Sequence, residues 1–398
     1  MSNTATNRRP EVDEDWADLI GEFEIQPGTT YLNQGSFGIA PRQVREARRR
    51  WIDLLDAQPM NFYCRDFESH MESAIGKLAS FLNTNSGNLI FAENATTAMN
   101  VVANSLKLNS GDQVLSNNHE YGAVHRIWQR ACNNASAELK IATLPESFES
   151  HSQIVDAIFA EVTDRTRLIV VSHITSSTAL IMPVKEICQR AAKHGIPVAI
   201  DGPHAPAHVL LDLTEIGCAF YAASCHKWLA ATLGSGFLFV HSDFHNSIEV
   251  PMKGWGRLSP GVPEKWNEEF IWPGTRDPSS YFSVVNAIEF MESIGLDNFR
   301  ARTRYMQRET TRQLMELTGK HPIGRDLDLW YGTMSHVPLP DGDWSNLQKW
   351  LWEESQIEIP VINFAEKWYI RASHHLYNTR SQYDFLIERL KIAFTKQT

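Results

Sequence analysis

Between residues 88 and 240 the sequence alternates short apolar runs with amphipathic segments, and this alternation is the feature that most constrains the fold. Seven apolar runs predict strands, at residues 89–92, 113–116, 139–142, 167–172, 197–201, 219–223 and 237–240. The segments between them have the apolar spacing of helices, at residues 97–106, 121–133, 152–162 and 184–194. Such alternation is typical of a parallel sheet covered by helices. We therefore expect an α/β fold with a mostly parallel seven-stranded sheet.

The pattern changes near Tyr281, which indicates a second structural unit. Long helical patterns are followed there by isolated strand patterns, at residues 281–294, 299–317, 335–338 and 367–372. A chain of 398 residues is long enough for one large and one smaller domain. We expect a large domain at residues 31–280 and a small α+β domain at residues 281–398. The N-terminal arm, residues 1–30, is expected to pack on the small domain.

The composition argues against several classes of protein. A formal net charge of −10 disfavours a nucleic-acid or anionic-membrane partner, because such surfaces are bound through clustered cations. No run of about 18 apolar residues is present, and the N-terminus lacks the apolar core of a signal peptide. The five cysteines are scattered and form no C-x-x-C pair, which favours a reducing compartment. We expect a cytoplasmic protein without a membrane span or a disulfide framework.

Lys227 is the first candidate for chemistry. It follows the apolar strand predicted at residues 219–223, directly after Ser224, Cys225 and His226. Desolvation at such a strand end lowers the pKa of a lysine and allows its amine to act as a nucleophile. Taken alone, the residue is better explained as a polar cap on a strand end.

Polar residues also follow the other predicted strands, at the edge where open α/β sheets bind ligands. Ala95, Thr96 and Thr97 begin a helix, whose free amides and dipole favour an anion such as phosphate. The same residues also suit an ordinary helix cap. Tyr121 can stack on a flat ring. Asp201 ends a buried strand, where a carboxylate needs a cationic or donor partner such as a protonated ring nitrogen.

Together these residues form the set that pyridoxal phosphate requires: a lysine for an imine, a carboxylate for the pyridinium, an anion site and an aromatic side chain. Signatures of nucleotide-binding loops, zinc proteases and serine hydrolases are absent. A metal site from His173, His204, Cys225 and His226 is conceivable. No pair of these residues has a familiar ligand spacing, so we expect no metal.

The motifs resemble those of the class V aminotransferase group of fold-type I pyridoxal-phosphate enzymes, and within it the isopenicillin N epimerase-like branch. The resemblance extends over nearly the whole chain, through the segments 31–38, 94–97, 201–204, 224–228, 274–277, 371–373 and 377–379. It implies that Lys227 forms the imine and moves the α-proton, that Asp201 pairs with the ring nitrogen, and that His204 lies near the phenolic oxygen.

The resemblance also implies a set of residues that bind the cofactor, pyridoxal 5'-phosphate. They are Ala95, Thr96, Thr97, Tyr121, Ser176, Asp201, His204, Ser224, His226 and Lys227, with Thr275 contributed by a second subunit. Tyr121 occupies the position of the family's ring-stacking histidine. The family is typically a homodimer with active sites at the interface, so a homodimer is expected here.

For the substrate, the resemblance implies that Arg371 binds a carboxylate as a bidentate pair, which suits an amino acid. Asn33, Ser36 and Phe37 would close over the substrate, although a purely structural turn explains this segment as well. The family's cysteine desulfurases carry a nucleophilic cysteine shortly before the carboxylate-binding arginine. Residues 358–367 contain none, so desulfuration through a persulfide is not expected.

The expected function is therefore that of a pyridoxal-phosphate enzyme acting at the α-carbon of an amino acid or of an amino-acid-containing compound. Proton return to the opposite face gives epimerisation, loss of a β-substituent gives a carbon–sulfur lyase, and protonation of the cofactor carbon gives transamination. The sequence leaves these three outcomes open, because they depend on the placement of acids and leaving groups. A non-catalytic binding protein with the same fold is the alternative from another class.

Overall fold

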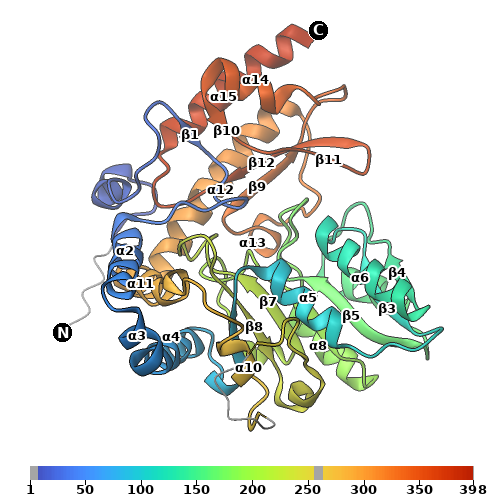
Figure 1. Cartoon of the computed structure of the whole chain (residues 1–398). Helices are drawn as coiled ribbons and strands as arrows, with labels where there is room; N and C mark the ends of the chain where they lie inside the picture. The colour runs from blue at the N-terminus through green and yellow to red at the C-terminus, as the bar shows by residue number, and fades with distance from the viewer. Residues whose placement is uncertain (1–7, 255–262, 398) are drawn as a thin grey trace.

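The computed structural model describes residues 8–254 and 263–397, and its centre is a seven-stranded sheet (Figure 1). The strands are β2 (Leu89–Ala92), β3 (Gln113–Asn117), β4 (Glu138–Ala142), β5 (Thr166–Ser172), β6 (Val198–Asp201), β7 (Phe220–Ser224) and β8 (Gly236–Val240). Their order is β2-β8-β7-β6-β5-β3-β4, and β8 runs antiparallel to both of its neighbours. The prediction of a mostly parallel sheet is confirmed.

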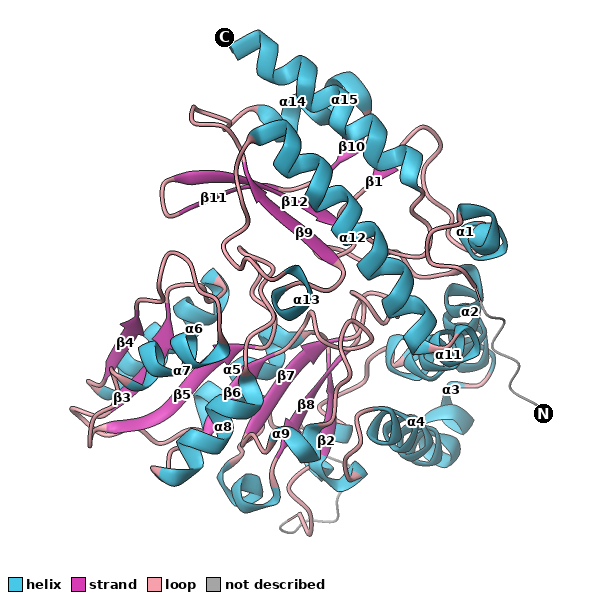
Figure 2. Cartoon of the chain, turned by 180° about the vertical axis from the view of Figure 1, so that it is seen from behind, coloured by secondary structure: helices cyan, strands magenta, loops and turns pink. Residues whose placement is uncertain are grey.

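Helices cover both faces of this sheet. Successive strand residues point to opposite sides, so an apolar strand presents an apolar surface on each face for helices to cover. On β5, Leu168 and Val170 join the core under α5 (Ala95–Ser105) and α6 (Gly122–Ala135). Ile169 and Val171 join the core on the other face, under α7 (His151–Phe159) and α8 (Val184–Lys193). Figure 2 shows the second face, with the short helix α9 (Leu213–Ile216) beside α8. Strands buried on both faces explain the continuous apolar runs in the sequence.

The second unit contains a smaller antiparallel sheet, in the order β11-β12-β9. Its strands are β9 (Met334–Pro338), β11 (Val361–Phe364) and β12 (Lys367–Ser373), and the helices α12 (Leu296–Thr318), α14 (Leu347–Ser355) and α15 (Arg380–Gln397) lie with it at the top of Figure 1. Near the N-terminus, β1 (Thr30–Tyr31) pairs in parallel with β10 (Ile357–Glu358). Leu32 consequently belongs to the core of this second unit. In the part of the chain that the structure describes, no helix has the length and apolar character needed to cross a membrane.

Helix α11 (Ser279–Ile294) begins at the predicted domain boundary but packs with the first unit. It lies against α2 (Arg42–Ala57) and α4 (Phe67–Phe81), as Figure 2 also shows. The ring of Phe282 on α11 is 4.9 Å from that of Trp51 and 6.2 Å from that of Phe67, measured between centroids. By its packing, α11 therefore extends the large unit beyond residue 280.

The N-terminal arm is fixed to α12 by a buried cation. Arg302 is fully buried, forms an ion pair with Asp13, and donates a hydrogen bond of 2.6 Å to the carbonyl of Pro10. Its guanidinium also lies 5.7 Å from the ring centroid of Trp16, which is itself fully buried. Because a buried guanidinium needs an anion, the acidic side chain of the arm is a condition for this packing.

We expect Asp13→Ala to lower the free energy of unfolding by about 2–4 kcal/mol, because the substitution leaves Arg302 buried without a counterion. Urea denaturation of the purified protein measures the change. Asp18→Ala is the control, since the ion pair of Asp18 with Arg8 is solvent-exposed on the carboxylate side and an exposed pair contributes about 0–1 kcal/mol. Equal losses in the two variants would contradict a special role for the buried pair.

Candidate active site

A cavity of about 430 Å³ opens at the carboxyl ends of the parallel strands, a volume ordinary for a small-molecule site. Most of the predicted site residues line it: Ser36, Phe37, Ala95, Thr96, Tyr121, Ser176, Asp201, His204, Ser224, His226, Lys227 and Arg371. The loops after β2, β3, β5, β6 and β7 supply most of them, and β12 of the second unit supplies Arg371. The site therefore lies where the large sheet meets the second unit.

Lys227 presents an amine whose neutral form is substantially populated near pH 7. Its Nζ lies 3.1 Å from Nε2 of His204, and the indole N–H of Trp228 donates to Nδ1 of the same imidazole at 3.2 Å. Because an indole can only donate, the ring hydrogen of neutral His204 is on Nε2 and points to the lysine nitrogen. Burial, and then the positive charge of Arg371, lower the pKa of Lys227 to about 7. Burial likewise lowers the pKa of His204.

Asp201 is the last residue of β6 and is buried at 4% exposure. It is flanked by Ser172 on β5 and Ala222 on β7. Burial raises the pKa of its carboxyl to about 7, and the positive charge of Lys227 opposes that rise. A carboxyl in this state can pair with a protonated ring nitrogen, because such a partner favours its ionised form.

The first turn of α5 forms one wall of the cavity. The side chain of Asn94 caps the helix by accepting a hydrogen bond from the amide of Thr97 at 2.8 Å. The hydroxyl of Ser224 accepts from the amide of Ala95 at 3.0 Å. A Cβ at Gly236 would lie 2.9 Å from the Cα of Asn94, so glycine is required for this close approach of helix and strand. The arrangement holds the positive end of the helix dipole at the cavity.

His226 adds a polar group to the same wall. Its Nδ1 is buried and lacks a hydrogen-bond partner in the described part of the chain. Burial lowers the pKa of this imidazole to about 4, so the ring is neutral near pH 7. An unpaired buried polar atom beside a helix N-terminus fits a phosphate group, which can accept or share a proton there.

Arg371 is a buried cation, and no carboxylate of the described residues forms an ion pair with it. Its Nη2 donates to the hydroxyl of Ser36 at 3.1 Å, and its Nη1 donates to the carbonyl of Ser176. Its Nε is buried without a partner, and burial lowers the pKa of the guanidinium to about 10. A buried guanidinium with neutral partners only is strongly favoured to bind an anion such as a carboxylate.

The turn at residues 33–38 lies against the backbone of the reactive lysine. The side-chain amide of Gln34 donates to the carbonyl of Lys227 at 2.8 Å and accepts from the amide of Ile39 at 2.9 Å. A Cβ at Gly38 would lie 1.9 Å from the carbonyl oxygen of His226, so only glycine fits. The turn brings Ser36 and Phe37 to the cavity, with the Phe37 ring 68% exposed.

Three predicted residues do not line the cavity of this chain. Asn33 donates to the carboxylate of Glu358 at 3.2 Å, which holds its side chain at the second unit. Thr97 lies one position beyond the wall, with its amide engaged by the helix cap. Thr275 is exposed in the segment before α11, and its contribution to a second subunit stays a prediction.

Four residues not predicted individually also line the cavity: Gly35, Asn94, Ile174 and Pro203. Gln34 and the buried carboxyl of Glu120 were missed as well. Glu120 lies three positions after Asn117, the last residue of β3, and its place near a strand end was the available signal. The prediction for this turn used only the aromatic ring of Tyr121.

These residues fit pyridoxal phosphate. The neutral amine of Lys227 can attack an aldehyde, the carboxyl of Asp201 can pair with a ring nitrogen, and the α5 wall with its unpaired imidazole nitrogen can hold a phosphate. Tyr121 offers an aromatic face at the mouth, where its side chain is 45% exposed.

The comparisons with known sequences lead to one family. The profile of the class-V aminotransferases matches residues 40–386. Isopenicillin N epimerases of Amycolatopsis lactamdurans and Streptomyces clavuligerus are each 32% identical to this chain, over 94% of it and 98% of their own length. A putative L-cysteine desulfhydrase of Oryza sativa subsp. japonica is 27% identical over 96% of this chain and 86% of its own.

Solved structures agree in fold. The cystine C–S lyase C-DES, in complex with cysteine persulfide, has a TM-score of 0.80 at 21% identity, covering 92% of this chain and 97% of that one. A C-DES variant with glycine linked to its pyridoxal-phosphate cofactor has a TM-score of 0.81 at 20% identity, covering 93% and 98%. The chain is a member of the class-V aminotransferase family and a pyridoxal-phosphate-dependent enzyme of fold-type I.

Proposed function

We propose that this enzyme removes the α-proton of an amino acid, or of the amino-acid end of a larger compound, and returns it on the opposite face. The observation that carries the proposal is that the buried guanidinium of Arg371, which pairs with no carboxylate of the described residues, lies in the same cavity as the amine of Lys227, whose pKa is lowered to about 7 by burial. Similarity to two isopenicillin N epimerases over 94% of the chain supports epimerisation as the outcome.

When bound, pyridoxal phosphate supplies an aldehyde for amine exchange and a ring that withdraws electrons from the substrate α-carbon. Asp201 would hold the ring nitrogen, Tyr121 would cover the ring face, and the wall formed by Thr96, Ser224 and His226 would hold the phosphate. Thr275 of a second subunit would complete that wall.

The side chains of this enzyme then orient the substrate and move its proton. Arg371, held by Ser36 and the carbonyl of Ser176, would fix the α-carboxylate. The neutral amine of Lys227 would accept the α-proton, and the N–H of His204 would hold that amine in position. Epimerisation also needs an acid on the other face of the α-carbon to return a proton.

A second candidate function is carbon–sulfur β-elimination. The similarity to L-cysteine desulfhydrases supports it, and transamination is the further alternative within the family. One assay separates them with candidate amino acids in deuterated water. Inversion with α-deuterium incorporation supports epimerisation, pyruvate with ammonia supports elimination, and dependence on an added keto acid supports transamination. Protein that stays colourless after addition of pyridoxal phosphate would support a binding protein instead.

We also infer a cytoplasmic homodimer. Five cysteines without a disulfide support a reducing compartment. The exposed position of Thr275, outside the cavity of its own chain, supports a contribution to a neighbouring subunit. Sedimentation of the purified protein tests the dimer.

We expect Lys227→Ala to abolish the visible absorbance of the imine with pyridoxal phosphate, because the variant lacks the amine that forms it. Turnover should fall to background. Lys185→Ala is the control, since that lysine pairs with Glu215 on the surface. Retention of the imine spectrum in Lys227→Ala would place the reactive amine elsewhere.

The rate of cofactor attachment to cofactor-free enzyme should rise with pH and level off above about pH 7. The neutral amine is the nucleophile, and burial with the charge of Arg371 lowers the pKa of Lys227 to about 7. Stopped-flow absorbance after mixing with pyridoxal phosphate measures this rate. A rate that still climbs from about pH 8 to pH 10, as for an ordinary lysine, would contradict the neutral amine.

Arg371→Ala should raise KM for an amino acid by on the order of 100-fold, because a charge-assisted bidentate pair is lost. Cofactor absorbance should persist, since the guanidinium binds the substrate. Arg371→Lys should recover only part of the affinity, because an ammonium cannot form the bidentate pair. An unchanged KM in Arg371→Ala would move the carboxylate site to other residues.

A further inference from the structure

Glu120 is a buried carboxyl that the reaction proposed above leaves without a role. It lies between β3 and α6 and is 5% exposed. Its Oε1 accepts hydrogen bonds from the backbone amide of Tyr121 at 2.8 Å and from the hydroxyl of Ser172. Its Oε2 is buried and has no partner within residues 8–254 and 263–397. An ionised carboxylate would leave this oxygen without a donor, which is unfavourable in a buried position.

Ser172 connects Glu120 to the cofactor site. In the parallel pairing of β5 and β6, Ser172 lies directly beside Asp201. Side chains of paired residues point to the same face of a sheet, so the hydroxyl and the Asp201 carboxyl are neighbours. Asp201 lines the cavity, whereas Glu120 does not. The two carboxyls therefore lie one behind the other, with the Ser172 hydroxyl between their strands.

Asp201 is the charged group that acts on Glu120. The imidazoles close to Glu120 or Ser172 along the chain are those of His119, of His125 on α6 and of His173, which follows β5, and burial lowers the pKa of each. They are consequently uncharged near neutral pH. Burial, and then the negative charge of Asp201, raise the pKa of Glu120 to about 8.

Asp201 holds a negative charge more favourably than Glu120 does. The positive form of Lys227 favours ionised Asp201, and Asp201 borders the cavity where a cationic ring nitrogen would bind. On Glu120, the Tyr121 amide and the Ser172 hydroxyl both donate to Oε1, whereas Oε2 is buried without a partner in the described residues. Because two adjacent buried charges of the same sign repel each other, one proton is retained by the pair, and Glu120 is the residue that holds it.

We propose that Glu120 is a positioning residue that keeps a proton behind Asp201, so that the site presents one negative charge to the ring nitrogen of the cofactor. The inference rests on the proposed role of Asp201. Loss of the proton from Glu120 would place a second negative charge behind Asp201. The ring nitrogen would then hold its own proton more tightly, and the electronic state of the bound cofactor would change with pH.

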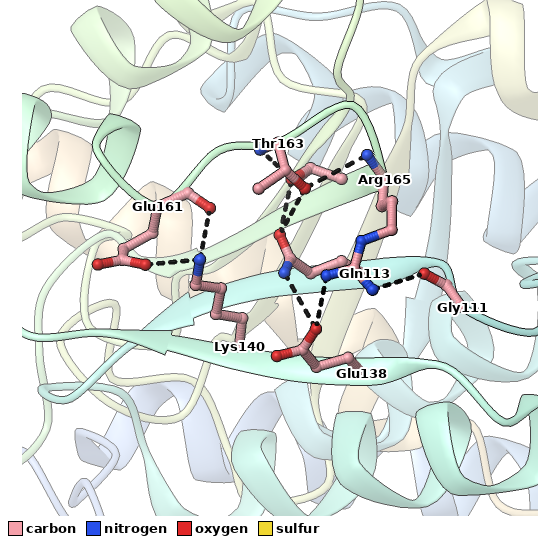
Figure 3. Close-up of polar contacts among 8 residues, drawn as sticks. Gly111, Gln113, Glu138, Lys140, Glu161, Thr163 and Arg165 are labelled. Carbon is pink, nitrogen blue, oxygen red and sulfur yellow. Dashed lines mark hydrogen bonds and ion pairs between the residues drawn. The ribbon is translucent and has the colours of Figure 1, made fainter.

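The test is a pH titration of the visible absorbance of the holoenzyme, with Glu120→Gln as the main variant. The amide keeps an acceptor at Oε1 but cannot ionise. We expect a transition near pH 8 in the original enzyme and its loss in Glu120→Gln. Glu138→Gln is the matched control: it makes the same chemical change at the amino end of β4, away from the cavity, where Glu138 accepts from Gln113 and Arg165 (Figure 3). This control should keep the transition.

A second variant decides the question if Glu120→Gln does not fold or does not hold the cofactor. Ser172→Ala removes a hydrogen bond that favours ionised Glu120. The transition should therefore move upward by about one pH unit, the order expected for one hydrogen bond to a charged group. An unmoved midpoint in Ser172→Ala, or a complete transition in folded Glu120→Gln, would overturn the proposal.

This titration uses no substrate, so its result is independent of which amino acid the enzyme accepts. Asp201→Asn tests the underlying assignment separately. If Asp201→Asn leaves the absorbance and its titration unchanged, the proposed role of Asp201 fails and the inference about Glu120 fails with it. If Asp201→Asn alters the spectrum while Glu120→Gln does not, the inference about Glu120 alone is wrong.

Discussion

Burying an amine and a carboxyl in one cavity sets the conditions for the rest of the active site. Neither Lys227 nor Asp201 is fully hydrated, and burial shifts the pKa of each toward 7. The two groups can therefore exchange charge with a ligand at neutral pH, which is the property required of an acid–base site. The surrounding imidazoles remain neutral for the same reason, as at His204 and His226. Burial at the carboxyl ends of the strands thus determines the protonation states of these side chains as well as their positions.

The second unit completes a site that the large sheet cannot form alone. The strands of the large sheet end in groups suited to the cofactor, whereas the cation suited to a substrate carboxylate comes from Arg371 on β12. The guanidinium is held by Ser36 from the N-terminal turn and by the carbonyl of Ser176 from the large unit. Three separate parts of the chain therefore meet at one charged group.

The strands of the large sheet were predictable because burial on both faces leaves continuous apolar runs that end in polar residues. The direction of β8 was not, since side-chain pattern does not encode whether a strand runs parallel. The rule that ligands bind at carboxyl ends found Asp201 and Lys227. Arg371 came from the family resemblance, because a cation on the second sheet carries no such local signal.

Some features of the structure depend on contacts that local sequence does not carry. Asn33 was assigned to the substrate, but a hydrogen bond to Glu358, 325 positions away, holds its side chain elsewhere. Such a contact depends on the pairing of β1 with β10 and leaves no trace in local sequence. Glu120 was not predicted because its burial depends on a hydrogen bond with Ser172, 52 positions away. The predicted domain boundary follows a change in the sequence pattern, and the packing of α11, which begins there, on Trp51 and Phe67 is a long-range contact that this pattern does not show.

The parallel pairing of β1 with β10 has a mechanical consequence. The chain passes from this pairing on the second unit, through Gln34, to a hydrogen bond with the carbonyl of Lys227. The hydroxyl of Tyr377, in the segment before α15, donates to the same Gln34 side chain at 3.0 Å. A rotation of the second unit relative to the large sheet would therefore pull on the backbone that carries the reactive amine. The turn therefore couples the distance between the two units to the position of the Lys227 backbone.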